Sequence, residues 1–236
     1  MKTIYHSGDS RGHANHGWLN AYHSFSFANY YNPERIHFGA LRVLNDDTIA
    51  PGEGFGTHPH DNMEIITIPL SGDLEHKDSM GNSGIIQNGE IQVMSAGTGI
   101  QHSEFNHNQN KELKLLQIWV FPNKLDVKPR YDQISLPEKE NELVQIVSPN
   151  KDDDGVWIHQ DAWFLLGNLK QGWEGEYQLK SKSHGVYAFI IDGKVKIENQ
   201  ELDKRDALGI SDTEKFSITV SEDSKVLLME VPMQIK

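Results

Sequence analysis

The sequence predicts an all-β protein made of two tandem β-barrel, or jelly-roll, domains. Twenty glycines and nine prolines interrupt short apolar runs rich in Ile, Val, Phe, Tyr and Trp, as is typical of sandwiches and barrels. Long helical periodicity is missing. The two halves also resemble each other, since IITIPLSGDLE (65–75) lines up with YAFIIDGKVK (187–196), which indicates an internal repeat.

Short runs bounded by turn residues mark the individual strands. In the first half we expect strands at 23–30, 38–43, 64–70, 89–94 and 113–121, with a turn at 45–47. Residues 122–155 are rich in proline and acidic clusters, and we interpret them as a linker that holds one short strand at 143–147. In the second half, Asp192-Gly193 predicts a hairpin, and 215–220 and 225–232 are expected as separate strands.

These boundaries divide the chain into an N-terminal domain (1–133) and a C-terminal domain (134–236). The repeat places Leu179 and Ser181 where the first copy has His58 and His60. Since neither residue binds metals, we expect the second domain to lack a metal site.

Composition excludes several classes of protein. The net charge is −12 without a basic patch, which argues against direct contact with nucleic acid. The absence of cysteine excludes disulfides and thiolate metal sites. No run of about 18 apolar residues occurs, and the N-terminus lacks the apolar core of a secretory signal. We therefore expect a cytoplasmic protein without a membrane span.

Two pairs of polar residues carry the functional signal. His58 and His60 follow a glycine-rich turn in GFGTHPH, and His102 and Glu104 follow another in GTGIQH. Residues i and i+2 of a strand point to the same face, so each pair can direct both side chains at one point. Three imidazoles and one carboxylate suit a divalent transition metal with open coordination positions.

The spacing alone leaves the carboxylate ligand open. Glu64 also follows the first pair, as HxHxxxE, and could replace Glu104 as the fourth ligand. His76 and His107 are further candidates, although the pattern around each of them is more typical of a surface residue.

The residues that suggest a metal site also carry a family resemblance. Gly52 to Glu64 resembles the first cupin motif, and Gly97 to His102 with Asn106 resembles the second. The segments HSFSFANYYNP, LRVLNDD, GFGTHPHDNMEI and MSAGTGIQHSE are similar to those of the pirin family. The resemblance implies a bicupin fold whose N-terminal barrel binds metal through His58, His60, His102 and Glu104, which favours Glu104 over Glu64.

The resemblance also implies an activity, because bacterial pirins are similar to quercetin 2,3-dioxygenases. Such an enzyme opens the central ring of a flavonol with O₂ and releases carbon monoxide, and Glu104 would be the catalytic base. We expect iron(II), with nickel, manganese, copper or zinc as alternatives, in a pocket lined by first-barrel aromatics and closed by the linker or the second barrel. The alternatives are a metal- or redox-sensing regulatory protein with a protein partner, and another cupin chemistry.

Overall fold

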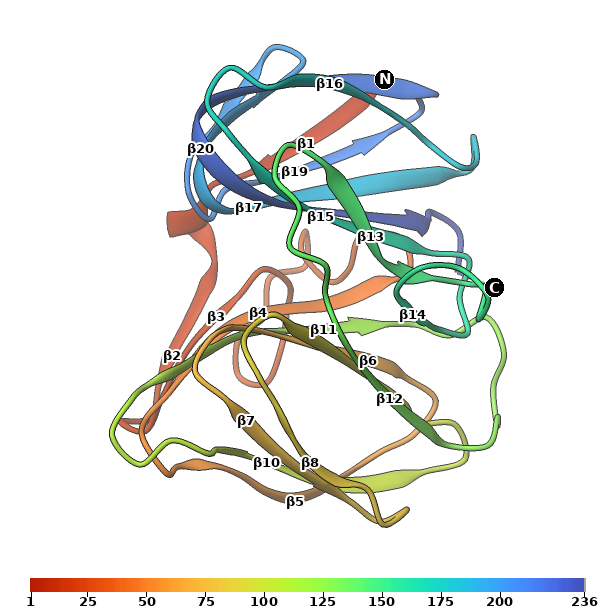
Figure 1. The fold of residues 1–236 in the computed structure, drawn as a ribbon. Helices are drawn as coiled ribbons and strands as arrows, with labels where there is room; N and C mark the ends of the chain where they lie inside the picture. Colours follow the sequence, from red (N-terminus) through yellow and green to blue (C-terminus); the bar gives the residue numbers. More distant parts are fainter. Residues whose placement is uncertain (236) are drawn as a thin grey trace.

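Two β-barrels lie one above the other and form an elongated molecule (Figure 1). A computed structural model describes residues 1–235. It confirms the predicted all-β fold, because the helical structure of these residues is limited to the short 3₁₀ turn η1 (Gly8–Ser10). None of the described residues belongs to a helix that is long and apolar enough to cross a membrane.

The first barrel consists of two antiparallel sheets. The larger sheet has the strand order β12-β9-β6-β11-β4-β3-β2, and the smaller has the order β5-β10-β7-β8. Their strands are β2 (Gly12–Asn15), β3 (Leu19–His23), β4 (Leu41–Ile49), β5 (Gly54–His60), β6 (Glu64–Ser71), β7 (Leu74–Asp78), β8 (Ser83–Ile86), β9 (Glu90–Ser95), β10 (Ile100–Asn106), β11 (Leu113–Val120) and β12 (Arg130–Ser135).

The second barrel is one strongly curled sheet with the central order β1-β19-β17-β20-β15-β13-β14. Two further strands, β16 and β18, pair with β20 and β17 respectively. The strands are β1 (Lys2–His6), β13 (Leu143–Ser148), β14 (Val156–Trp157), β15 (Trp163–Leu169), β16 (Glu174–Gln178), β17 (His184–Ile197), β18 (Gln200–Leu202), β19 (Ala207–Ser211) and β20 (Lys215–Pro232).

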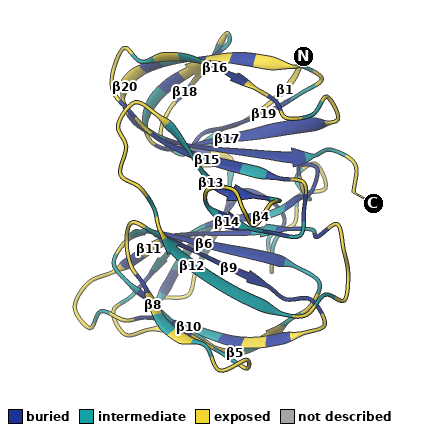
Figure 2. Ribbon diagram, turned by 45° about the vertical axis from the view of Figure 1, so that its right-hand side comes forward, coloured by how far each residue is buried: buried dark blue, intermediate teal, exposed yellow. Residues whose placement is uncertain are grey.

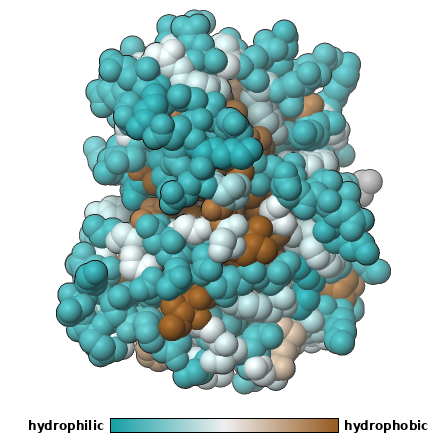
Figure 3. Space-filling model, viewed as in Figure 1, coloured by the Kyte–Doolittle hydropathy of each residue, from teal (hydrophilic) through white to brown (hydrophobic). Residues whose placement is uncertain are grey.

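The largest apolar core lies between the barrels. It joins Leu116 and Ile118 of β11 to Tyr187 and Phe189 of β17, all of which are buried. Dark, buried strands therefore face each other across the boundary (Figure 2). Apolar atoms also reach the surface along this boundary, whereas most of the visible face is hydrophilic (Figure 3). Because side chains alternate along β11, its other residues point into the first barrel.

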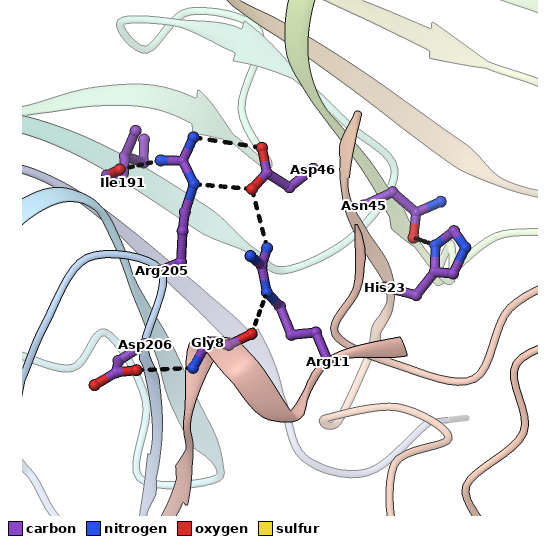
Figure 4. A network of polar contacts seen from close by, with 8 residues as sticks. All are labelled: Gly8, Arg11, His23, Asn45, Asp46, Ile191, Arg205 and Asp206. Atoms are coloured by element: carbon purple, nitrogen blue, oxygen red, sulfur yellow. Dashed lines mark hydrogen bonds and ion pairs between the residues drawn. The ribbon is translucent and has the colours of Figure 1, made fainter. Parts of the chain in front are cut away.

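A largely buried polar cluster also joins the barrels (Figure 4). Asp46 of β4 accepts hydrogen bonds from Arg11 (3.0 Å) and from the Nε of Arg205 in the second barrel (2.8 Å). Arg205 also donates to the carbonyl of Ile191, and the three charged side chains are only 8–19% exposed. Two guanidinium groups therefore neutralise one largely buried carboxylate between the barrels.

Several predicted elements are wrong in detail. Residues 45–47 continue β4 instead of forming a turn, because their backbone pairs with both β3 and β11. The strand expected at 23–30 does not form, because β3 already ends at His23. Phe27 and Tyr30 instead close a tight turn.

The predicted hairpin at Asp192-Gly193 is also wrong, because β17 continues through it. Gly193 has φ +84°, and the register with β20 shifts on both sides of it. This glycine therefore forms a bulge that bends a long strand, and β20 likewise runs unbroken through both of the segments expected as separate strands.

The division into residues 1–133 and 134–236 stays a proposal, and two strands depart from it. β1 pairs with β19 of the second barrel, although it opens the chain. β12 pairs with β9 of the first barrel and extends to Ser135. The segment expected as a linker thus contributes an edge strand to the first barrel.

The cluster around Asp46 gives a stability prediction. Asp46→Asn leaves two largely buried guanidinium groups without their carboxylate, so the free energy of unfolding should fall by about 3 kcal/mol. Urea unfolding measures the change. Asp212→Asn is the matched control, because its ion pair with Lys2 is exposed and its loss should have little effect. Equal stability of Asp46→Asn and wild type would contradict this role.

Candidate metal centre

Three histidines meet where β10 pairs with β5. The register places His102 opposite His58, and the period of two brings His60 to the same side. One ring nitrogen from each of the three lies within 4.8 Å of the others. The ring centroids of His58 and His102 are 4.3 Å apart, and those of His60 and His102 are 4.9 Å apart. The structure therefore brings together the three histidines that the sequence singled out.

The burial of His102 and its lack of hydrogen-bond partners indicate that this cluster fits a metal ion. Its side chain is 2% exposed, and both ring nitrogens are buried without a hydrogen-bond partner. Burial also lowers the pKa of His102 to about 2 and that of His60 to about 4. These imidazoles are neutral at neutral pH, which is the form that binds a cation. His58 Nδ1 contacts the Gly56 carbonyl at 2.8 Å, which fixes its ring.

Glu104 lies on β10, two residues beyond His102 and on the same inward face. Its carboxylate belongs to a second group, in which ligand atoms of His76, His102 and Glu104 lie within 4.8 Å of one another. Gln117 Nε2 donates to both carboxylate oxygens at 3.2 Å. Because Glu104 is buried, its pKa rises to about 7.

A row of polar side chains supports Glu104 from the opposite sheet. Strand pairing aligns Gln92, Thr67, Gln117, Asn45 and His23 across five neighbouring strands, and all are buried. Thr67 donates to Gln117 at 3.2 Å, and His23 contacts Asn45 at 2.8 Å. The interior of the first barrel is thus polar at the level of the site, whereas the core-facing side of a strand usually carries apolar residues.

The expectation that His76 is a surface residue is wrong. It is fully buried, its Nδ1 has no partner, and its Nε2 lies 3.3 Å from Asp78. Its ring centroid is 5.4 Å from that of His102. The sequence held a signal for this position, since His76 follows the buried Leu74 by two residues on β7.

The other two candidates lie away from the cluster. Glu64 accepts a hydrogen bond from Ser95 at 2.7 Å and lies near Arg130 and the backbone of His159. It shares the face of β6 that packs against the second barrel, so it does not contact the histidines. His107 is half-exposed and lies 3.6 Å from Glu75.

A cavity of about 380 Å³ opens beside the histidines. As expected, first-barrel aromatics line it, but the linker and the second barrel do not close it. The second barrel packs on the far face of the larger sheet, and β12 pairs at the edge of that sheet. The lining residues are Trp18, Phe27, Asn45, Asp47, Gly54, Phe55, Gly56, His58, His60, Glu104, Gln117 and Trp119.

Two cavity residues that the sequence did not single out have buried, unpartnered polar atoms. These atoms are Oδ1 of Asp47 and Nε1 of Trp119. Trp119 packs edge-on against His60 with the ring centroids 4.9 Å apart. Asp47 was hidden by the expected turn, but the alternation Asn45–Asp47–Ile49 within one strand could have placed it inside the barrel.

Comparison with known proteins agrees with the motifs. The Pirin family model matches residues 6–120, and the model of the quercetinase C-terminal cupin domain matches residues 145–231. The chain is 43% identical over 224 residues to a quercetin 2,3-dioxygenase of Escherichia coli (strain K12), which covers 95% of this chain and 96% of the relative. A pirin-like protein of Caulobacter vibrioides is 40% identical over 225 residues, covering 94% and 96%.

Solved structures give the same result. The crystal structure of YhhW from Escherichia coli has a TM-score of 0.95 at 41% identity and covers 99% of both chains. The structure of bacterial pirin YhhW in complex with nickel(II) has a TM-score of 0.94 at 40% identity and covers 99% of this chain and all of that one. The chain therefore belongs to the pirin family, as its motifs predicted.

Proposed function

We propose that His58, His60, His102 and Glu104 hold one divalent transition metal and that the protein is a flavonol 2,3-dioxygenase. The observation that carries the proposal is the triad of clustered histidines, with His102 unpartnered, at the wall of an aromatic cavity. Relatives named quercetin 2,3-dioxygenase support the substrate class. Nickel(II) in YhhW supports a divalent ion. For this chain we propose iron(II).

When bound, the metal would supply an open coordination position and lower the pKa of a substrate hydroxyl that reaches it. Glu104 would accept the proton of that hydroxyl, because its carboxylate lines the cavity and lies beside the histidines. Gln117 holds both oxygens of this carboxylate and would keep it directed at the substrate. The ionised flavonol is then electron-rich enough to react with O₂, which opens the central ring and releases carbon monoxide.

Four aromatic residues would orient the flat substrate. Trp18 packs edge-on against Phe55 (5.1 Å between centroids), and Phe27 packs edge-on against Trp119 (5.4 Å). All four line the cavity, so they offer apolar surfaces to an aromatic ring and exclude water from the reacting atoms.

The metal assignment predicts that His102→Ala loses the ion. Elemental analysis after purification without added metal should give close to one ion per wild-type chain and almost none for the variant, because a buried ligand is removed. His107→Ala is the matched control, since that half-exposed residue lies outside the cluster, and it should keep the metal. Full metal content in His102→Ala would refute the assignment.

The proposed base gives a second test. At saturating metal, Glu104→Gln should lower the rate of flavonol loss by about 10²–10⁴-fold, because the amide cannot take the proton. Absorbance of the flavonol, O₂ uptake and release of carbon monoxide measure turnover. Glu64→Gln is the control, because Glu64 is also buried but faces the second barrel. If the metal-loaded wild type fails to consume O₂ with every flavonol tested, the enzymatic proposal fails. The non-catalytic regulatory alternative is then favoured.

Gly56 allows the cavity to be narrowed without disturbing the fold. A Cβ built there meets no atom within 4 Å, and the residue lines the cavity beside His58. Gly56→Val should therefore raise KM for flavonols at least tenfold, because the side chain occupies substrate space, while thermal unfolding and metal content stay unchanged. Unaltered KM would show that the substrate binds elsewhere.

A further inference from the structure

Asp47 has a buried carboxyl group that the fold does not fully supply with hydrogen-bond partners. Its side chain is 5% exposed, and Oδ1 has no hydrogen-bond partner. The preceding residue provides the contrast, because Asp46 is held by both Arg11 and Arg205. The two acids point to opposite faces of β4, so the chain neutralises the carboxylate between the barrels and leaves the one inside unpaired.

Strand pairing places Asp47 at the end of the cavity away from Trp119. Trp119 pairs with Val43 of β4, and Asp47 follows four residues later, which is roughly 13 Å along the strand. Trp119 packs against His60 of the metal cluster, whereas β4 runs past Asp47 toward Trp18, whose carbonyl accepts a hydrogen bond from the backbone of Ala50. The cavity wall thus extends from Trp119, beside His60, to a carboxyl group.

Each end of this cavity has one buried polar atom without a partner. The indole Nε1 of Trp119 can only donate a hydrogen bond, and the carboxyl Oδ1 of Asp47 can accept one. A buried polar group without a partner destabilises a fold, and an apolar side chain of similar size would avoid that cost. Such pairs of unsatisfied groups are expected where a ligand completes them.

We propose that Asp47 is a specificity-determining residue that binds a phenolic hydroxyl of the substrate, at the end of the cavity wall that lies away from Trp119. The inference rests on the proposed function and narrows its substrate class. The preferred substrate is an elongated, flat aromatic compound with a hydrogen-bond acceptor near Trp119 and a ring hydroxyl at the far end. A flavonol without hydroxyls on its outer aromatic rings would leave Asp47 unpaired.

Binding of two flavonols to metal-loaded protein tests this role. Two dissociation constants are measured by quenching of tryptophan fluorescence without O₂, so that turnover does not interfere. Quercetin has hydroxyls on its outer aromatic rings, whereas 3-hydroxyflavone has only the 3-hydroxyl of the central ring. In wild type, quercetin should bind more tightly by about ten- to a hundredfold. Asp47→Val should abolish this difference by weakening quercetin alone, and Asp47→Asn, which keeps a hydrogen-bonding oxygen, should restore part of it.

Stability gives an independent readout. Asp47→Val should raise the Tm of the ligand-free protein by about 2–6 °C, because it removes an unpaired buried carboxyl. A fall in Tm would show that the fold itself partners this group, and it would contradict the inference. Asp46→Asn is the matched control on the same strand, and it should lower Tm while leaving the preference for quercetin intact.

The outcomes separate the two proposals. If both flavonols bind and their affinity ratio is the same in wild type and Asp47→Val, the role of Asp47 is wrong but the proposed function stands. If neither flavonol binds to the metal-loaded wild type, both proposals are overturned.

Discussion

The alternation of side chains across the seven-stranded sheet is the constraint on which this structure depends. Along β11, Leu116 and Ile118 face the second barrel, whereas Gln117 and Trp119 face the cavity. The same sheet therefore provides one wall of the interdomain core and one wall of the site. A slip of one residue in its register would exchange the two faces and destroy both. Apolar packing against the second barrel thus holds the site wall in place without any second-barrel residue lining the cavity.

This arrangement allows the interior of the first barrel to be polar. The second barrel fills its interior with an apolar cluster that includes Val186, Ile190 and Leu228. The first barrel instead has the row from Gln92 to His23 and the histidine cluster, with apolar groups on either side. Since the boundary between the barrels supplies the largest buried apolar core, the first barrel can keep hydrogen-bonding groups and a cavity where packing would otherwise be densest.

Unpartnered polar atoms concentrate in this interior. Among the residues that the structure describes, the buried side-chain atoms without a partner belong to Asp47, His76, His102 and Trp119. All four residues lie in the first barrel, at the cluster or in the cavity wall. Other groups do have partners, such as the buried Glu230 and the largely buried Asp46. The unpartnered groups, which lower the stability of the fold, are therefore located where a metal ion and a substrate would supply the missing bonds. This is expected for a binding site.

The sequence by itself determined the all-β class, the two barrels, the family and the pairing of His58 and His60 with His102, because same-face spacing and glycine-rich turns are local properties. It could not place Glu64, which has a motif position but points to the other barrel. The sequence also placed Asp47 in an expected turn and His76 in a polar segment, so neither was predicted to lie inside the barrel. Only the tertiary structure decided these cases, since inward or outward orientation depends on which strands pair and in what register. Local composition does not contain that information, and it follows from packing of the whole sheet.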